Sequence, residues 1–180
     1  MAGVRLGGLR GSALEDAINR TAEAYLLRHL ALVQKIPTPI VPSRLDPNTG
    51  VITEAFFEQK STVDYIGNVQ GIPVCFDAKE CAGDSFPLKN VQDHQIRFME
   101  DWEQQDGIAF LLIRYTKKDL DYYLRFPKLR EFLARMEQGG RKSIAFSELE
   151  EDFFLKPRAA FLVPFLDGLK RDLALREDEE

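Results

Sequence analysis

The sequence predicts a single α/β domain in which a mixed sheet is flanked by helices. The expected elements follow one another as helix, several strands, helix, two strands and helix, an order that packs helices against a shared sheet. The run Ile108–Ile113 is apolar throughout, which is typical of a buried strand. A length of 180 residues and a hydrophobic fraction of 44% are sufficient for one complete core.

The first expected element is a helix that begins at Ser12. Residues 1–11 carry glycines and two arginines before it, and we expect a flexible basic arm that either contacts phosphates or is a plain disordered terminus. Apolar side chains recur at helical spacing from Leu14 to Val33, with His29 packed or half-exposed on the helix. Ser12 and Glu15 have the spacing of a capping box, and the alternative is that Glu15 is an accessory acid in a functional site.

A proline-rich segment followed by a turn predicts a projecting β-hairpin over about residues 40–59. Three prolines between residues 37 and 42 exclude a helix and favour extended chain. The composition of Asp46–Gly50 is that of a tight turn, and Val51–Phe57 returns as a second extended run. Prolines at the base and polar residues at the tip suit a protrusion, and a buried meander is the alternative.

The rest of the chain is expected to alternate loops, helices and strands within one domain over residues 12–176. Residues 177–180 are expected to form a solvated acidic tail. The other expected elements are a loop at 80–85, a helix at about 90–105 with an apolar stripe of Val91, Phe98, Met99 and Trp102, a strand at 121–126, a short helix at 127–136, a short strand at 143–146 and an outer helix after Pro164.

Candidate chemistry lies in residues 62–79. Asp64 follows a strand-like run, a glycine-bearing turn is expected at 67–71, and a second strand ends in Asp77-Ala78-Lys79. Because side chains alternate along a strand, Asp77 and Lys79 are expected on one face of the sheet.

Two acids and a lysine in this arrangement suit metal-assisted phosphodiester cleavage. Carboxylates brought close together repel each other and gain most when a hard cation such as Mg²⁺ lies between them. A lysine beside the ion can orient or help to deprotonate the attacking water, and it can offset the negative charge that develops on the phosphorane. The spacing D-x12-D-x-K is that of the PD-(D/E)xK nuclease core. The alternative is a solvated strand with an ordinary ion pair.

The acidic balance of the chain, with a net charge of −5, is segregated and does not exclude a nucleic-acid partner. Residues 45–111 hold twelve Asp and Glu against four Lys and Arg, and a bound cation would neutralise part of this excess. Residues 112–144 hold nine basic against four acidic side chains. Either phosphate contacts or an ordinary solvated surface are expected at Arg44, Lys60, Arg114, Lys117, Lys118, Lys128, Arg130, Arg141 and Lys142.

The cysteine content favours a reducing, cytoplasmic setting. Cys75 and Cys81 are the only cysteines, and neither a signal peptide nor a long apolar run accompanies them, so no membrane partner is expected. These two residues and His94 lack the fourth ligand of a zinc site.

Nine short segments carry a resemblance to a known family. They are GSALEDAIN (11–19), KIPTPI (35–40), ITEAFF (52–57), STVDYIG (61–67), FDAKE (76–80), SFPLKN (85–90), HQ (94–95), DGIAF (106–110) and GRKSI (140–144). Their order and spacing, from about residue 8 to residue 169, resemble the RecU family of Holliday junction resolvases, also named penicillin-binding protein-related factor A.

The resemblance implies a restriction-endonuclease-like (PD-(D/E)xK) fold and a homodimer that binds four-way DNA junctions. It implies resolution by symmetric paired nicking with Mg²⁺, or with Mn²⁺ as a substitute, in homologous recombination and DNA repair, with recombination proteins as further partners. Thr62, Asp64, Asp77 and Gln95 correspond to the metal-site residues, directly or through water, and Lys79 corresponds to the catalytic lysine. The hairpin at 40–59 corresponds to the family stalk, which enters the central opening of the junction.

Two features depart from the family pattern. Asp77 stands where relatives carry Glu, which shortens the side chain by one methylene. The hairpin has Arg44 and Lys60 against three acids, and fewer phosphate contacts weaken binding and flatten its salt dependence. The alternative function is therefore a junction-binding recombination scaffold with weak or lost nuclease activity, and a restriction-like nuclease acting on linear duplex is a third hypothesis.

Overall fold

The computed structural model describes residues 12–37, 39–57 and 62–179. Its body is built on a six-stranded sheet of order β1-β4-β5-β7-β8-β10. Strands β5 and β7 pair in parallel, and the other neighbours pair antiparallel. This mixed sheet confirms the predicted α/β class. The strands are β1 (Leu32–Lys35), β4 (Tyr65–Val69), β5 (Ile72–Cys81), β7 (Ile108–Tyr115), β8 (Leu120–Arg125) and β10 (Phe154–Leu155).

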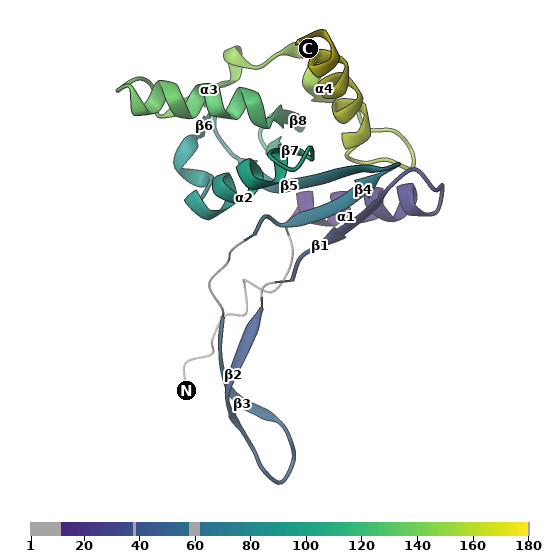
Figure 1. Cartoon of the computed structure of the whole chain (residues 1–180), viewed down its shortest axis with the longest axis vertical. Helices are drawn as coiled ribbons and strands as arrows, with labels where there is room; N and C mark the ends of the chain where they lie inside the picture. Colours follow the sequence, from purple (N-terminus) through teal and green to yellow (C-terminus); the bar gives the residue numbers. More distant parts are fainter. Residues whose placement is uncertain (1–11, 38, 58–61, 180) are drawn as a thin grey trace.

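Helices cover both faces of this sheet (Figure 1). On one face lie α1 (Ala13–Leu26) and α4 (Phe165–Glu179), where the ring of Phe165 lies 5.0 Å from Tyr25 of α1 and 5.3 Å from Phe76 of β5. The opposite face carries α2 (Asp93–Glu103) and α3 (Phe126–Glu137), which together line one surface hollow. Among the described residues, no helix is long and apolar enough to cross a membrane.

A row of stacked aromatic rings forms the core beneath α1 and α4. Tyr65 stacks on Phe76 at 4.7 Å, Phe76 on Phe110 at 4.6 Å, and Phe110 on Tyr123 at 4.2 Å between ring centroids. The four rings come from β4, β5, β7 and β8 in turn and are buried. Because each aromatic pair adds about 1 kcal/mol beyond its buried area, this row holds the central strands in register.

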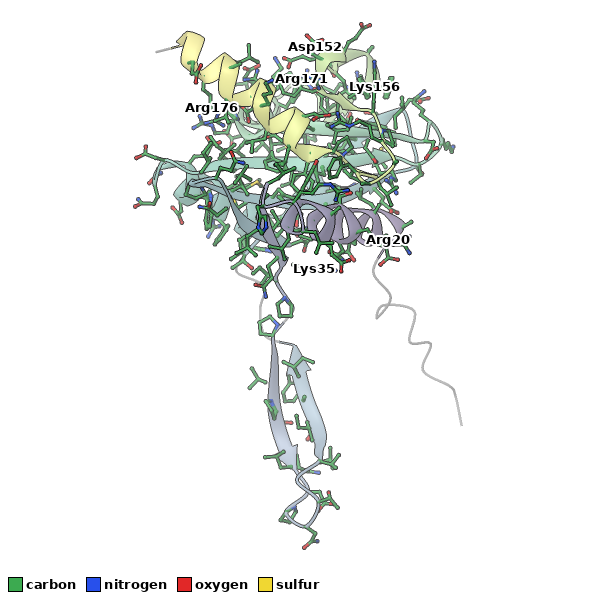
Figure 2. All side chains as sticks on the ribbon, turned by 90° about the vertical axis from the view of Figure 1, so that its right-hand side faces the viewer. Arg20, Lys35, Asp152, Lys156, Arg171 and Arg176 are labelled. Carbon is green, nitrogen blue, oxygen red and sulfur yellow. The ribbon has the colours of Figure 1, made fainter. Side chains whose placement is uncertain are left out.

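The predicted hairpin is confirmed as a separate two-stranded sheet, β2 (Ile40–Leu45) and β3 (Ile52–Phe57), which projects from the body (Figures 1 and 2). At its tip, the N–H group of Asn48 donates to Asp46 Oδ1 at 2.8 Å, and Gly50 adopts a φ of +69°, which favours glycine. The alternative of a buried meander is wrong, because every residue of β2 is exposed.

The prediction of one helix reaching Val33 is wrong. Helix α1 ends at Leu26, and His29, with a φ of +56°, turns the chain so that β1 begins at Leu32. His29 is therefore exposed in a turn and not packed on the helix. The apolar spacing fitted a helix, but pairing of β1 with β4 overrode it. Gly67 lies within β4 and admits β1, since a Cβ there would meet the Leu32 carbonyl oxygen at 2.3 Å.

The turn expected at 67–71 is confined to Gln70 and Gly71, because Gly67 lies within β4, and Asp64 precedes this strand instead of following one. The other elements follow the predictions with shifted ends. Strand β5 continues to Cys81, α2 begins at Asp93, and α4 extends through Glu179 into the expected acidic tail. A small second sheet pairs β6 (Ser85–Pro87), which the sequence did not predict, with the predicted short strand β9 (Ser143–Ala145). Short 3-10 turns occupy Leu88–Asn90 (η1), Phe146–Glu148 (η2) and Glu151–Phe153 (η3).

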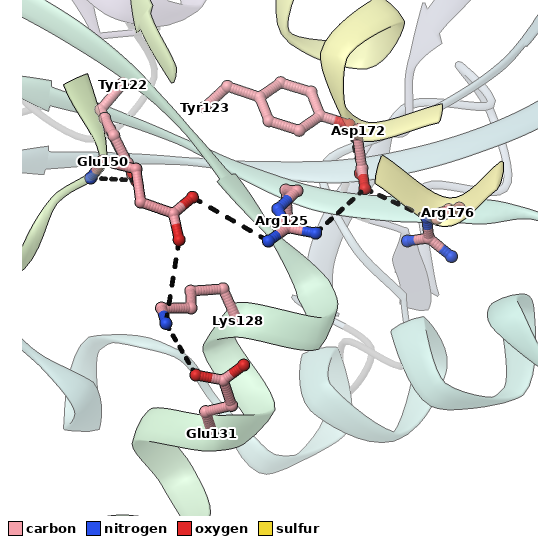
Figure 3. A network of polar contacts seen from close by, with 8 residues as sticks. All are labelled: Tyr122, Tyr123, Arg125, Lys128, Glu131, Glu150, Asp172 and Arg176. Carbon is pink, nitrogen blue, oxygen red and sulfur yellow. Dashed lines mark hydrogen bonds and ion pairs between the residues drawn. The ribbon is translucent and has the colours of Figure 1, made fainter. Parts of the chain in front are cut away.

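A buried polar network fastens α4 to the sheet (Figure 3). Asp172, which is 0% exposed, accepts hydrogen bonds from the Tyr123 hydroxyl at 3.1 Å and from Arg176 Nε at 3.0 Å. Arg125 lies 3.9 Å from the same carboxylate. Arg176 also donates to Glu103 at 2.6 Å, so the network ties α4 to the end of α2 as well as to β8.

Candidate active site

The site is built around Asp77 in the middle of β5. Strand alternation points Asp77 and Lys79 away from the aromatic row that contains Phe76. The Asp77 side chain is 0% exposed and that of Lys79 is 18% exposed. Lys79 Nζ forms an ion pair with Asp77 Oδ2. The predicted placement of the acid and the lysine on one face is therefore confirmed.

Asp64 reaches the site from the chain segment that precedes β4. The register pairs Tyr65 with Phe76, so Asp64 lies next to Asp77 across the two antiparallel strands. The backbone N–H of Asp64 donates to Asp77 Oδ1 at 3.1 Å, and its carbonyl accepts the Ile36 N–H at 2.8 Å. Asp64 is half-buried, and so is Thr62 two residues earlier. The shorter side chain of Asp77 thus still meets Asp64.

Gln95, at the third position of α2, completes the group of side chains around Asp77. Its Oε1 accepts the Gln92 N–H at 2.9 Å, which fixes the direction of the amide. Its Nε2 then donates to Asp77 Oδ2 at 2.7 Å, and the residue is only 3% exposed. In this orientation Gln95 holds the Asp77 carboxylate in place.

Burial, which has the largest effect, and the neighbouring Asp64 carboxylate together raise the pKa of Asp77 to about 7 against the opposing effect of Lys79. Two acids that share one buried position with a single lysine carry more negative charge than their surroundings neutralise. Additional positive charge at this position would therefore stabilise the ionised form of Asp77.

The donor set fits a hard divalent cation. Carboxylate and hydroxyl oxygens are available from Asp64, Asp77 and Thr62, and Mg²⁺ is commonly held by one or two carboxylates while it keeps several waters. Gln95 turns its amide nitrogen toward Asp77 and its oxygen toward the Gln92 N–H, so in this orientation it supports the carboxylate and does not offer an oxygen to the cation. Within the described ranges, no cluster of three or more His, Cys, Asp and Glu residues exists that would form an all-protein cage. A cation with a large share of water ligands is the one this arrangement suits.

Comparison of the sequence with known proteins identifies the family to which the chain belongs. A family model described as Recombination protein U (RecU) matches residues 9–171. The chain belongs to the RecU family. Proteins named Holliday junction resolvase RecU are similar to it at 38% identity in Limosilactobacillus reuteri (strain DSM 20016; 93% of this chain, 84% of the relative), 39% in Listeria innocua (86% and 82%) and 44% in Bacillus subtilis strain 168 (79% and 70%). The resemblance seen in the sequence is confirmed.

The basic side chains expected at DNA divide into engaged and exposed groups in this RecU chain. Arg114 makes two 2.7 Å hydrogen bonds to Asp121 and is 18% exposed, so its guanidinium is already committed. Lys118 pairs with Asp84 at 2.8 Å and lies over the Phe146 ring. Lys128 pairs with Glu131 at 2.7 Å, as Figure 3 shows.

The exposed basic residues lie around the small sheet β6–β9 and on the hairpin. Lys117 is exposed in the β7–β8 turn, and Arg141 and Lys142 are exposed just before β9. Arg130 lines the hollow between α2 and α3. Arg44 on β2 has a 76% exposed side chain that lies 4.0 Å from Glu54. Lys60 and the expected basic arm lie outside the described residues.

The capping interpretation of Glu15 is confirmed. Its Oε2 accepts the Ser12 N–H at 3.2 Å, and the Ser12 hydroxyl accepts the Glu15 N–H at 3.3 Å. The same carboxylate pairs with Lys35 at 2.7 Å.

Two side chains beside the site received no role from the sequence. One is Lys35, the partner of Glu15. The other is Glu80, whose Oε1 accepts the Leu14 N–H at the start of α1 at 3.2 Å. Strand alternation after Lys79 was a usable signal for Glu80, because it directs that side chain to the face on which α1 lies.

Proposed function

We propose that this RecU chain is a structure-selective endodeoxyribonuclease that resolves Holliday junctions by symmetric paired nicking in homologous recombination and DNA repair. The observation that carries the proposal is the convergence of Asp64 and Lys79 on the buried carboxylate of Asp77. Its relatives are named Holliday junction resolvase RecU, and the similarity covers most of their length. A restriction-endonuclease-like fold is part of the proposal. It is supported by one acid just before β4, a second acid on the neighbouring strand β5, and a lysine two residues after the second acid.

Each member of the site has a defined task in the proposed reaction. Asp64 and Asp77, with Thr62 and Gln95 directly or through water, would hold Mg²⁺, for which Mn²⁺ is a substitute. The bound ion would supply Lewis-acid polarisation of the scissile phosphate and of the attacking water. Lys79 would orient that water and offset the negative charge that develops on the phosphate. Gln95 would keep the Asp77 carboxylate in one orientation.

The hairpin and the exposed basic residues would bring DNA to the site. A projecting pair of strands suits insertion into the open centre of a four-way junction, with Arg44 of β2 near its phosphates. Lys60, outside the described residues, is proposed as a second phosphate contact. Lys117, Arg141 and Lys142 would contact the duplex backbone around β6–β9, because phosphate contacts supply most of the affinity. Lys118 would join them by exchanging its partner Asp84 for a phosphate.

A homodimer would place two equivalent sites on the two strands to be cut, since a two-fold axis generates paired positions. Recombination proteins would be further partners. The buried free thiols of Cys75 and Cys81 support a reducing, cytoplasmic setting.

A four-way junction labelled on each strand in turn, with Mg²⁺ or Mn²⁺, tests the proposal. The wild type is expected to make symmetric nicks and to leave linear duplex uncut. Lys79→Ala is expected to bind the junction normally and to nick about a hundredfold more slowly, as for loss of one charge-stabilising group. Equal nicking by Lys79→Ala, or equal cutting of linear duplex, would contradict it.

Binding without nicking by the wild type would favour the scaffold alternative. One observation favours this alternative. The hairpin is poor in basic residues, and its Arg44 lies 4.0 Å from Glu54, which offsets its charge.

A further inference from the structure

The two strands of the hairpin return to the body at one point, and that point is Asp64. The N–H of Ile36, just after β1, donates to the Asp64 carbonyl at 2.8 Å and extends the β1–β4 ladder by one bond. On its other side, the Asp64 N–H donates to Asp77 Oδ1 at 3.1 Å. The Asp64 peptide is therefore held between the root of the hairpin and the acid it must meet.

The first strand of the hairpin is also fixed to α1. Lys35 lies where the hairpin leaves the body (Figure 2), and its Nζ pairs with Glu15 Oε2 at 2.7 Å. The side chains are only 37% and 20% exposed, so water screens this pair less than a fully exposed one. Glu15 is itself held by the capping box with Ser12.

Helix α1 is tied back to the strand that carries the site. The Leu14 N–H donates to Glu80 Oε1 at 3.2 Å, and Glu80 follows Lys79 in β5. The contacts thus close a ring that runs from Lys35 to Glu15, along the first turn of α1 to Glu80, through β5 to Asp77, and by Asp64 and Ile36 back to Lys35. We call this the root ring.

We propose that Lys35 is a positioning residue whose ion pair with Glu15 fixes the root of the hairpin and thereby the place of Asp64 relative to Asp77. The inference rests on the proposed function and adds which contacts set the distance between the two acids of the site. In the described residues, the last bond of the β1–β4 ladder joins Ile36 to Asp64, so the position of β1 bears directly on the acid. With the root ring intact, Asp64 keeps its place beside Asp77.

The test uses Glu15→Gln, which removes the charge but retains the cap, since Gln serves at this position of a capping box. Junction affinity is expected to stay within twofold of the wild type, kcat for nicking to fall about fivefold, and the affinity for Mn²⁺, measured by calorimetry without DNA, to fall similarly. Lys35→Met is expected to reproduce these changes, and Lys35→Arg, which keeps the pair, to restore wild-type values. Glu23→Gln, an exposed acid on the same helix, is the matched control.

The outcomes separate this inference from the proposed function. Glu15→Gln with kcat and Mn²⁺ affinity both within twofold of Glu23→Gln would overturn the positioning role. So would a loss of junction affinity in Lys35→Met without any change in Mn²⁺ affinity, because Lys35 would then act as a phosphate contact. If the wild type does not nick junctions, the proposed function fails, while a fall in Mn²⁺ affinity in Glu15→Gln would still support the root ring.

Discussion

Replacing Asp77 with asparagine is expected to stabilise the metal-free protein at neutral and alkaline pH while it abolishes nicking. The carboxyl is 0% exposed and lies beside Asp64, and burial together with that neighbour holds its pKa at about 7 in the folded chain. In the unfolded chain the same group ionises near 3.8. Ionised Asp77 therefore lowers stability in the absence of a cation, and the uncharged amide of the asparagine variant removes this effect.

The size of this effect follows from the two pKa values. Because the folded chain holds the proton more tightly, the stabilising effect of protonation is fully present below pH 4 and is lost as the pH rises through about 7. The total loss is on the order of 4 kcal/mol, at about 1.4 kcal/mol for each pKa unit. About 3 kcal/mol of it falls between pH 5 and pH 8.

Urea unfolding in EDTA at several pH values measures the effect. The free energy of unfolding of the wild type should fall more steeply from pH 5 to pH 8 than that of Asp77→Asn, by about 3 kcal/mol. Asp101→Asn, an exposed acid on α2, is the control and should follow the wild type. Equal slopes for Asp77→Asn and the wild type would refute the reasoning, and junction binding with lost nicking is expected of the variant.

Three further perturbations test other parts of the structure. Arg114→Ala leaves Asp121 without its bidentate partner and is expected to cost about 3 kcal/mol in urea unfolding; a loss of junction affinity without a loss of stability would instead indicate a phosphate contact. Gly168→Ala places a Cβ 2.5 Å from the Tyr123 ring and should cost about 2 kcal/mol, so an unchanged melting temperature would contradict the packing. Replacing residues 41–56 by a short turn should lower junction affinity at least about tenfold and leave Mn²⁺ affinity unchanged; undiminished preference for junctions over linear duplex would show that the hairpin does not select them.

Elements with one strong local signal were predictable from the sequence. The hairpin follows from prolines that exclude helix and from a turn sequence at Asp46–Gly50, and both act locally. The buried strand β7 follows from its unbroken apolar run. Strand β1 was missed because its residues also fit a helical spacing, and only the antiparallel partner β4, distant in the sequence, decides between the two. Strand β6 exists for the same reason, through pairing with β9.

Strand alternation and family resemblance were sufficient to predict the acids, the lysine and the glutamine of the site. The spacing D-x12-D-x-K brings in Asp64, alternation puts Asp77 and Lys79 on one face, and the resemblance adds Thr62 and Gln95. The contacts of Lys35 and Glu80 join segments that are distant in sequence, so no spacing rule reveals them. The same holds for Arg114, whose commitment to Asp121 depends on the register of β7 with β8.

The closure of the hairpin on itself has a consequence for how this architecture changes in evolution. Because Ile36 and Asp64 are joined by a 2.8 Å hydrogen bond, the chain that leaves the body at one returns to the body at the other. The entropic cost of a longer or shorter excursion between fixed ends grows only slowly with length. Insertions and deletions in the hairpin can therefore alter its reach and charge without moving the acids behind it. The hairpin is in this sense an exchangeable part, on which substrate preference can diverge while the chemistry stays constant.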